Sequence, residues 1–554
     1  MKKVLFLVTE LQKPVGGLYR YATELFPAWK HAVEQGKVGL EPFVLSLRDS
    51  GVLLRDLKPS PEFAQFVEAN KGMKVYEAVR GGIKCFFLES SLSEGERDAF
   101  HKELWDKFRI RSEKSANWDF YRKLNSFWKH APAVAEFWQQ RHSKEGIALV
   151  DAQDWLAFPA GFLCRERLKV PLVCRFHSGE FGRSLGKPDA DNAVLFIEAA
   201  AFQEADFVQG VSISEAKFEA YNLLPLKQSI TAELAAVKTQ KWAQEQAWRD
   251  ECFEKFSLLE PEDLSLIAQC VGGITNGIIL DDWRNVTPER IKFGRTVLRK
   301  LLPEKQKFVL FMGRAEWRKG IDHLLEAFEL LRDSSVGLVV SSRLSEDEYR
   351  KYYAKIVALG LAKDVVLYNG WVEEDLKKSL FCACDVLALP SLYEPFGLVT
   401  LEGLAADLAA ELNGFVGPVV VVGGNGGMKE VIRNGVDGFK VPMEREFELK
   451  PALLSRILKI ALNDEKLRHK ISAGGARRVQ QKYFSWAYIV ERIFEAYSNA
   501  QANYATWHGN GDAKPPLDMS AEFLHCRHVA KGVLREALKE AKTKSVSGVK
   551  EVKK

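Results

Sequence analysis

The chain has 554 residues, too many for one hydrophobic core, so at least two domains are expected. Its 79 basic and 74 acidic residues nearly balance, and without a long basic stripe the net charge of +5 gives no support to nucleic-acid binding. The apolar fraction of 47% and charged fraction of 28% are those of an ordinary soluble globular protein.

The cysteines and the apolar runs bear on the cell compartment. Eight cysteines are scattered along the chain, and none forms a C-x-x-C pair, which predicts buried free thiols in a reducing compartment. The first apolar run ends at Thr9, too early for a signal peptide, and no later run reaches the length of a membrane span. A cytoplasmic protein is therefore expected.

A strand, a glycine loop and a helix follow one another at the start of the chain. Residues 4–8 are an apolar run typical of an inner parallel strand, and a helix carrying Trp29 follows Gly16 and Gly17. Such a loop lets the backbone approach a phosphate closely. A tight turn explains two adjacent glycines equally well.

Polar residues follow two later strands of the first half. Asp154 and Trp155 come after the strand predicted over 147–150, and His177 comes after the strand over 170–176. The carboxyl ends of parallel strands face the crevice in which open α/β sheets bind ligands. The alternative is structural: Asp154 caps a helix, and His177 is a satisfied polar residue.

Two cations follow a strand of the second half. Arg314 directly follows the run 308–313, and Lys319 lies five residues later, before a helix. Cations on more than one side suit a diphosphate. A solvated pair of cations on a loop is the alternative.

The segment 390–403 contains the most informative pattern. An apolar strand over 386–389 precedes it, and a helix follows, with Pro395 and Gly397 breaking the chain between them. Backbone N–H groups at such a helix start are unpaired and attract phosphate. Glu394 lies in the turn and Glu402 on the first turns of the helix. The alternative is a capped helix with two solvated glutamates.

These two carboxylates, eight positions apart around Pro-Phe-Gly-Leu, resemble the signature of retaining glycosyltransferases of the GT-B type. The chain also resembles glycogen and starch synthases in four further places, in matching order: the Lys13…Gly16-Gly17-Leu loop, Asp154-Trp155, His177 and Asn276-Gly-Ile. In the first of these, two residues rather than one separate Lys13 from Gly16. The resemblance spans roughly residues 3–497.

The resemblance implies the α/β GT-B fold, with two Rossmann-like domains facing an interdomain cleft and a C-terminal helix crossing back to the first domain. The implied acceptor domain spans 1–287, the nucleotide-sugar domain 288–483 and the crossover helix 484–500. A basic tail over 501–554 and a charged insert over 221–270 have no assigned role.

The resemblance also implies site residues. Catalytic roles fall to Glu394, His177 and Asp154. Donor or phosphate binding falls to Arg314, Lys319, Glu402, Gly16, Gly17, Lys13, Gly397, Leu398, Val399 and Thr400. Asn276, Trp155, Gly426 and Gly427 would line the acceptor side of the cleft. Neither a metal nor a cofactor is expected, since side-chain cations would hold the diphosphate of a donor such as ADP-glucose or UDP-glucose.

The preferred activity is transfer of a hexosyl, and more specifically glucosyl, unit to a glucan. A small sugar acceptor, a nucleotide-sugar epimerase and an inactive carbohydrate-binding protein are the alternatives. Phosphorylase chemistry is less favoured, because no motif would hold a pyridoxal phosphate lysine. The residues do not specify the base, the sugar, the acceptor or the oligomeric state.

Overall fold

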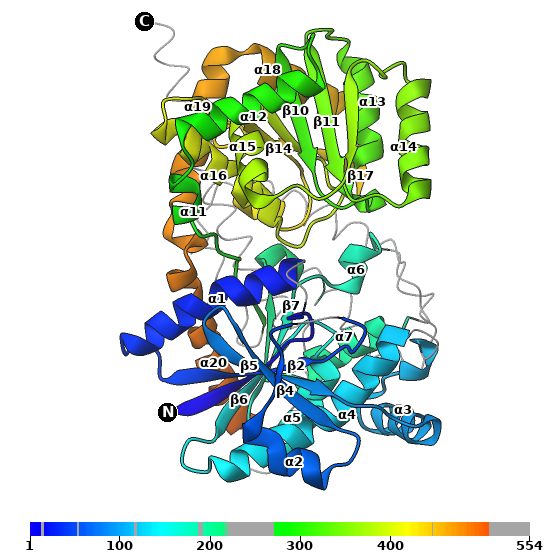
Figure 1. Ribbon diagram of the computed structural model, residues 1–554, viewed down its shortest axis with the longest axis vertical. Helices are drawn as coiled ribbons and strands as arrows, with labels where there is room; N and C mark the ends of the chain where they lie inside the picture. Colours follow the sequence, from blue (N-terminus) through cyan, green and yellow to red (C-terminus); the bar gives the residue numbers. More distant parts are fainter. Residues whose placement is uncertain are drawn as a thin grey trace, which may run out of the picture.

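The computed structural model describes residues 1–12, 16–52, 55–115, 119–186, 192–216, 219, 271–445 and 447–508. Two α/β units lie one above the other along the long axis of the molecule (Figure 1). Each contains one large, mostly parallel sheet with helices on its faces, which confirms the predicted pair of Rossmann-like domains.

The first domain is built on a nine-stranded sheet with the order β3-β4-β5-β2-β1-β6-β7-β8-β9. From β5 through β2, β1, β6, β7 and β8 to β9, neighbouring strands pair in parallel. Strands β3 and β4 add an antiparallel edge beside β5. The strands are β1 (Lys2–Leu7), β2 (Leu40–Leu47), β3 (Lys58–Pro59), β4 (Lys74–Arg80), β5 (Ile83–Glu89), β6 (Ile147–Gln153), β7 (Leu172–Phe176), β8 (Phe207–Gly210) and β9 (Val271–Gly273).

Helices cover both faces of this sheet, so its central strands are buried on both faces rather than alternately buried and exposed. Helix α1 shares one apolar core with residues 486–500, and α3, α4, α5 and α7 share the other. The helices are α1 (Gly17–Glu34), α2 (Ala64–Ala69), α3 (Glu94–Phe108), α4 (Asp119–Arg141), α5 (Phe158–Leu168), α6 (Glu180–Arg183) and α7 (Ala193–Glu204), with 3-10 turns η1 (Pro61–Phe63) and η2 (Ser112–Ser115).

The second domain has a six-stranded parallel sheet with the order β12-β11-β10-β13-β14-β15. Its strands are β10 (Lys307–Met312), β11 (Val336–Ser342), β12 (Val365–Asn369), β13 (Val386–Leu389), β14 (Val419–Gly423) and β15 (Phe439–Val441), and β16 (Met443–Arg445) and β17 (Glu448–Leu449) form a separate ribbon. The order reverses between β10 and β13, and ligands of open α/β sheets bind at such a point.

The helices of the second domain enclose its sheet. They are α11 (Asp281–Arg284), α12 (Pro288–Leu301), α13 (Ile321–Leu331), α14 (Glu346–Ala358), α15 (Glu374–Ala383), α16 (Leu398–Leu412), α17 (Met428–Val431), α18 (Pro451–Asn463) and α19 (Glu465–Val479), with 3-10 turns η4 (Trp317–Lys319) and η5 (Lys482–Phe484). Trp283 of α11 already packs in the core of this domain.

Helix α20 (Trp486–His508) returns to the first domain, as predicted; it is the orange helix that descends along the lower unit in Figure 1. Trp486 donates from Nε1 to Glu24 of α1 at 3.0 Å, and Tyr497 is buried against the sheet. The helix continues to His508, so the predicted boundary at 500 falls inside it.

Some sequence predictions lie outside the described residues. Lys13, the insert 221–270 and the end of the chain from 509 are among them. The five cysteines that are described, Cys85, Cys164, Cys174, Cys382 and Cys384, are buried free thiols, as predicted. Within the described ranges, no helix is both long enough and apolar enough to span a bilayer.

Candidate active site at the domain junction

The predicted pair Lys319 and Glu394 meets in the second domain. A side chain at Gly320 would collide with the carbonyl of Pro390, and Gly320 has φ +75°, so glycine lets the two loops approach closely. Leu392 N–H donates to the carbonyl of Arg318 at 2.7 Å across the same junction. The Lys319 ammonium contacts Glu394 Oε2 as an ion pair.

The charge of Glu394 depends on this pairing. Burial opposes ionisation, but Lys319, Arg318 and Arg314 outweigh it and lower the pKa of Glu394 below its ordinary value. Glu394 is therefore a carboxylate at neutral pH. Its side chain is 20% exposed and that of Lys319 is 14% exposed, so both keep some contact with solvent.

Gly426 and Gly427 pack closely against the backbone of Glu394 and Pro395. Gly427 N–H donates to the Glu394 carbonyl at 2.8 Å. A Cβ at Gly426 would overlap that carbonyl, and one at Gly427 would overlap the carbonyl of Pro395. These glycines therefore allow the loop after β14 to pack under the Glu394 turn.

Helix α16 begins without a side-chain cap. Its N-cap residue is Gly397, with φ +89°, and Leu398 and Val399 in the first turn are half-buried. The Oγ1 atom of Thr400 is buried and has no hydrogen-bond partner among the residues that the structure describes. The backbone N–H of Thr400 donates to the Gly397 carbonyl at 2.9 Å, so the donors that this helix start offers an anion are those of Leu398 and Val399. The alternative of a side-chain-capped helix is wrong.

Glu402, one turn further along α16, is buried rather than solvated. It accepts a hydrogen bond from Lys377 Nζ at 2.7 Å and contacts Arg20 of α1 as an ion pair. Burial raises its pKa, but these two cations outweigh burial and lower the pKa to about 2. Glu402 is thus an interdomain contact, and Arg20 is a residue that the sequence did not single out.

Arg314 has a different setting from Lys319. Its side chain is 73% exposed and pairs with Glu316 Oε1 at 2.9 Å. It still lies close enough to contribute to the field at Glu394. In this structure, Lys319 contacts the central carboxylate, whereas Arg314 extends into solvent.

Asp154 and His177 lie at the ends of neighbouring strands of the first domain, as predicted. Asp154 is 8% exposed and has φ +64°, an uncommon conformation for a residue other than glycine. Burial raises its pKa to about 6 despite the nearby Arg183. The N-cap of α5 is Ala157, so the alternative role of Asp154 as a helix cap is wrong.

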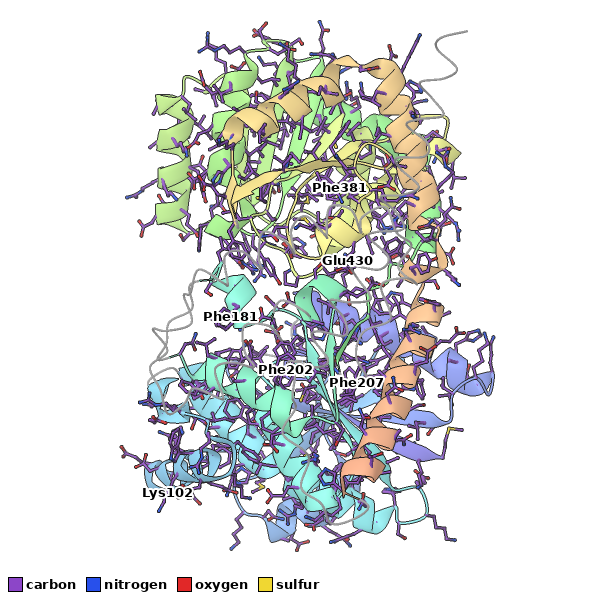
Figure 2. The ribbon with its side chains drawn as sticks, turned by 180° about the vertical axis from the view of Figure 1, so that it is seen from behind. Lys102, Phe181, Phe202, Phe207, Phe381 and Glu430 are labelled. Atoms are coloured by element: carbon purple, nitrogen blue, oxygen red, sulfur yellow. The ribbon has the colours of Figure 1, made fainter. Side chains whose placement is uncertain are left out.

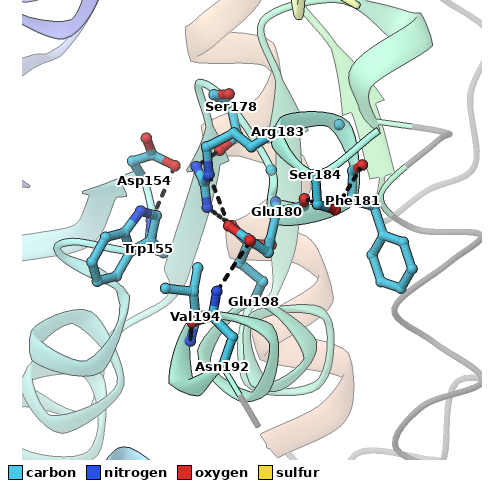
Figure 3. Close-up of polar contacts among 12 residues, drawn as sticks. Asp154, Trp155, Ser178, Glu180, Phe181, Arg183, Ser184, Asn192, Val194 and Glu198 are labelled. Atoms are coloured by element: carbon cyan, nitrogen blue, oxygen red, sulfur yellow. Dashed lines mark hydrogen bonds and ion pairs between the residues drawn. The ribbon is translucent and has the colours of Figure 1, made fainter. Parts of the chain in front are cut away.

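Arg183 is held beside Asp154 by carboxylates (Figure 3). Its Nε and Nη2 atoms lie 3.0 Å from Glu180 and 2.9 Å from the buried Glu198. Asn192 donates to Glu180 at 3.0 Å from the start of α7. Arg183 is the last residue of α6, six positions after His177, and nothing in the sequence indicated its pairing with two carboxylates.

Residues after β8 bind directly to both sides of Glu394. Ser212 Oγ donates to the Pro395 carbonyl at 2.6 Å, and the Tyr393 hydroxyl donates to the buried Glu215. Glu430, on the face of the second domain turned toward the first (Figure 2), accepts Ser214 N–H at 2.6 Å. The turn that carries Glu394 is thus hydrogen-bonded to the first domain.

A substitution at Gly182 can test this junction, because a Cβ there would collide with the ring of Tyr393. We expect Gly182→Val to weaken the interdomain contact by about 1–3 kcal/mol, as overpacking does. X-ray scattering should then show a larger radius of gyration. Gly95→Val is the matched control, since no atom of the described residues lies within 4 Å of where a Cβ at Gly95 would be. An unchanged scattering profile for Gly182→Val would contradict the contact.

The remaining predicted residues lie around this junction. Gly16 has φ +103° and precedes α1, and Gly17 has open space where a side chain would be. Trp155 is buried and donates its N–H to Asp154 Oδ1 at 3.1 Å. Asn276 is buried, and within the described ranges its Oδ1 has no hydrogen-bond partner. No group of three His, Cys, Asp or Glu side chains in the described part of the chain could hold a metal ion.

Parts of the chain are similar in sequence to a known protein family and to individual proteins. Residues 297–478 match the family model described as "Glycosyl transferases group 1". An uncharacterized glycosyltransferase of Methanocaldococcus jannaschii is 25% identical over 373 residues, which cover 65% of this chain and 79% of the relative. Alpha-maltose-1-phosphate synthase of Mycobacterium tuberculosis is 27% identical over 240 residues, 42% of this chain and 58% of the relative.

Solved structures share the fold. Sucrose-phosphate synthase from Thermosynechococcus elongatus superposes with a TM-score of 0.55 at 17% identity, over 91% of this chain and 100% of that chain. The catalytic domain of starch synthase IV from Arabidopsis thaliana, bound to ADP and acarbose, gives 0.57 at 16% identity, over 90% and 99%. These likenesses establish the GT-B fold.

Proposed function

We propose that this protein, whose residues 297–478 match the group 1 glycosyltransferase family model within a GT-B fold, moves a hexosyl unit from a nucleotide-sugar to a glucan, with retention of configuration. A glucosyl donor such as ADP-glucose or UDP-glucose is the first choice. The relatives named alpha-maltose-1-phosphate synthase and starch synthase IV support it.

The observation that carries the proposal is the contact between Lys319 and Glu394 beside the open start of α16. When the glycosidic bond to the diphosphate breaks, negative charge grows on the leaving oxygen and positive charge on the anomeric carbon. Lys319 and the N–H groups of α16 would stabilise the first, and Glu394 the second. The pair thus separates as substrate enters, and each member meets the opposite charge.

Further residues of both domains complete the proposed site. His177 and Asp154 would position the donor sugar and the acceptor hydroxyl, and Glu402 would accept hydrogen bonds from the ribose. Arg314 would help to neutralise the diphosphate. Residues 212–215 hold the Glu394 turn on the same side as these groups, which supports their joint action.

A screen with ADP-, UDP- and GDP-sugars, with and without glycogen, tests the proposal. We expect release of nucleoside diphosphate that depends on acceptor, with an α-configured product from an α-configured donor by NMR. Inversion of configuration would contradict the mechanism. An epimer formed without acceptor would favour the epimerase alternative.

A small sugar acceptor is the second candidate. The likeness to sucrose-phosphate synthase favours it, since that name denotes a product of two sugar units. Transfer to monosaccharide phosphates, with none to glycogen, would select it. No turnover of any nucleotide-sugar would instead support an inactive carbohydrate-binding protein.

A further inference from the structure

A chain of buried hydrogen bonds runs from the crossover helix to His177. Tyr497 of α20 donates from its hydroxyl to Asp151 Oδ2 at 2.6 Å. Gln153 donates from Nε2 to Asp151 Oδ1, also at 2.6 Å. Gln153 Oε1 then lies 2.9 Å from His177 Nε2. Asp151, Gln153 and Tyr497 are all within 1% of complete burial.

The chemistry of Asp151 fixes the direction of this chain. Burial raises the pKa of Asp151 to about 6, so at neutral pH the group is a carboxylate. A carboxylate only accepts hydrogen bonds, so the amide NH2 of Gln153 must face Asp151. The amide oxygen of Gln153 then faces His177, and an oxygen cannot donate. His177 must therefore carry its hydrogen on Nε2.

Other contacts hold the ring of His177 and keep it neutral. Tyr21 packs edge-on against it, with ring centroids 4.6 Å apart, and Arg175 lies 4.7 Å from the Tyr21 centroid. Burial and the Arg175 charge lower the pKa of His177 well below its ordinary value. Within the described residues, Nδ1 of His177 has no hydrogen-bond partner, so its lone pair is available in this half-buried side chain.

We propose that Gln153, backed by Asp151 and Tyr497, is a positioning residue that fixes His177 as the neutral Nε2–H tautomer. The Nδ1 lone pair then accepts a hydrogen bond from a hydroxyl of the donor sugar, which deepens the proposed function and rests on it. Without this chain of hydrogen bonds, the His177 ring can exchange tautomers and present an N–H at Nδ1 to the sugar instead of a lone pair.

The tautomer is measured without substrate, on full-length protein labelled with 15N-histidine. Long-range proton–nitrogen NMR correlations separate pyridine-like from pyrrole-like nitrogens, and His177→Asn assigns the signals. We expect a pyridine-like Nδ1 in the wild type. Gln153→Met should lose this preference, and kcat at saturating donor should fall roughly tenfold to a hundredfold, as for partners that orient site residues.

Two further variants keep the test specific. Gln209→Met is the matched control, because Gln209 is equally buried and its Oε1 accepts from Arg175 at 3.1 Å without contacting His177. It should keep the wild-type tautomer. Tyr497→Phe removes one oxygen and is the milder variant if Gln153→Met does not fold; it should shift the His177 signals in the same direction.

A pyrrole-like Nδ1 in the wild type would overturn the inference, as would Gln153→Met with an unchanged tautomer. Both results are independent of turnover. A protein that transfers no sugar yet shows the expected tautomer would refute the proposed function alone. An active protein with the wrong tautomer would refute only the role of Gln153.

Discussion

Lys319→Ala is expected to lower kcat for sugar transfer by roughly a hundredfold to a thousandfold, the effect of removing one preorganised donor at a developing charge. Lys319 is the cation that contacts Glu394, and its side chain is mostly buried. Its removal leaves the leaving oxygen less stabilised and Glu394 without its contacting cation. Steady-state assays of diphosphate release measure the effect.

Folding must be separated from chemistry in this experiment. Lys351→Ala is the matched control, because Lys351 is 59% exposed on α14 and pairs with Asp322 rather than with Glu394. It should keep wild-type kcat. Glu394→Gln should lose transfer to a similar extent as Lys319→Ala. Near-wild-type turnover of Lys319→Ala, in protein with unchanged melting temperature, would refute the assigned site.

Glu402→Gln is expected to flatten the acid limb of the stability curve. The pKa of Glu402 falls from 4.5 to about 2 on folding, which corresponds to about 3 kcal/mol of unfolding free energy. Because the folded pKa is the lower one, this stabilisation is complete above about pH 4.5 and is lost as pH falls toward 2. Urea unfolding across this range measures it.

The variant also bears on the donor site. Glutamine keeps the shape of Glu402 but leaves Arg20 and Lys377 without their shared carboxylate, so the Michaelis constant for the donor should rise together with the loss of stability. Glu346→Gln is the control, since Glu346 is 72% exposed and pairs with Arg350 on a helix surface. Equal acid sensitivity of wild type and Glu402→Gln would contradict the buried ion pairs.

Local sequence patterns predicted the parts of the fold that local physics determines. The apolar run of β13, the break at Gly397 and the helical spacing of α16 are consecutive, so the open helix start followed from the residues alone. The same holds for β7 and His177. Buried parallel strands and glycine junctions have strong local signals.

Contacts between distant segments were not predictable in this way. Arg20 pairs with Glu402 across 382 positions, and Ser214 binds Glu430 across 216. Each is a polar residue whose local surroundings resemble a solvated helix face. Only the packing of one domain on the other brings their charges together, and one sequence carries no sign of that.

Helix α20 has a consequence for biosynthesis. Ile489, Ile493 and Tyr497 complete an apolar core that otherwise contains Val4 and Trp29. During synthesis, this apolar core of the first domain stays incomplete until α20, the last described helix, leaves the ribosome. At about 5–20 residues per second, synthesis of the intervening second domain takes roughly 10–40 s. During that interval the nascent chain exposes apolar surface to which chaperones can bind. A circular permutant that places α20 before β1 should therefore depend less on chaperones for folding than the wild type.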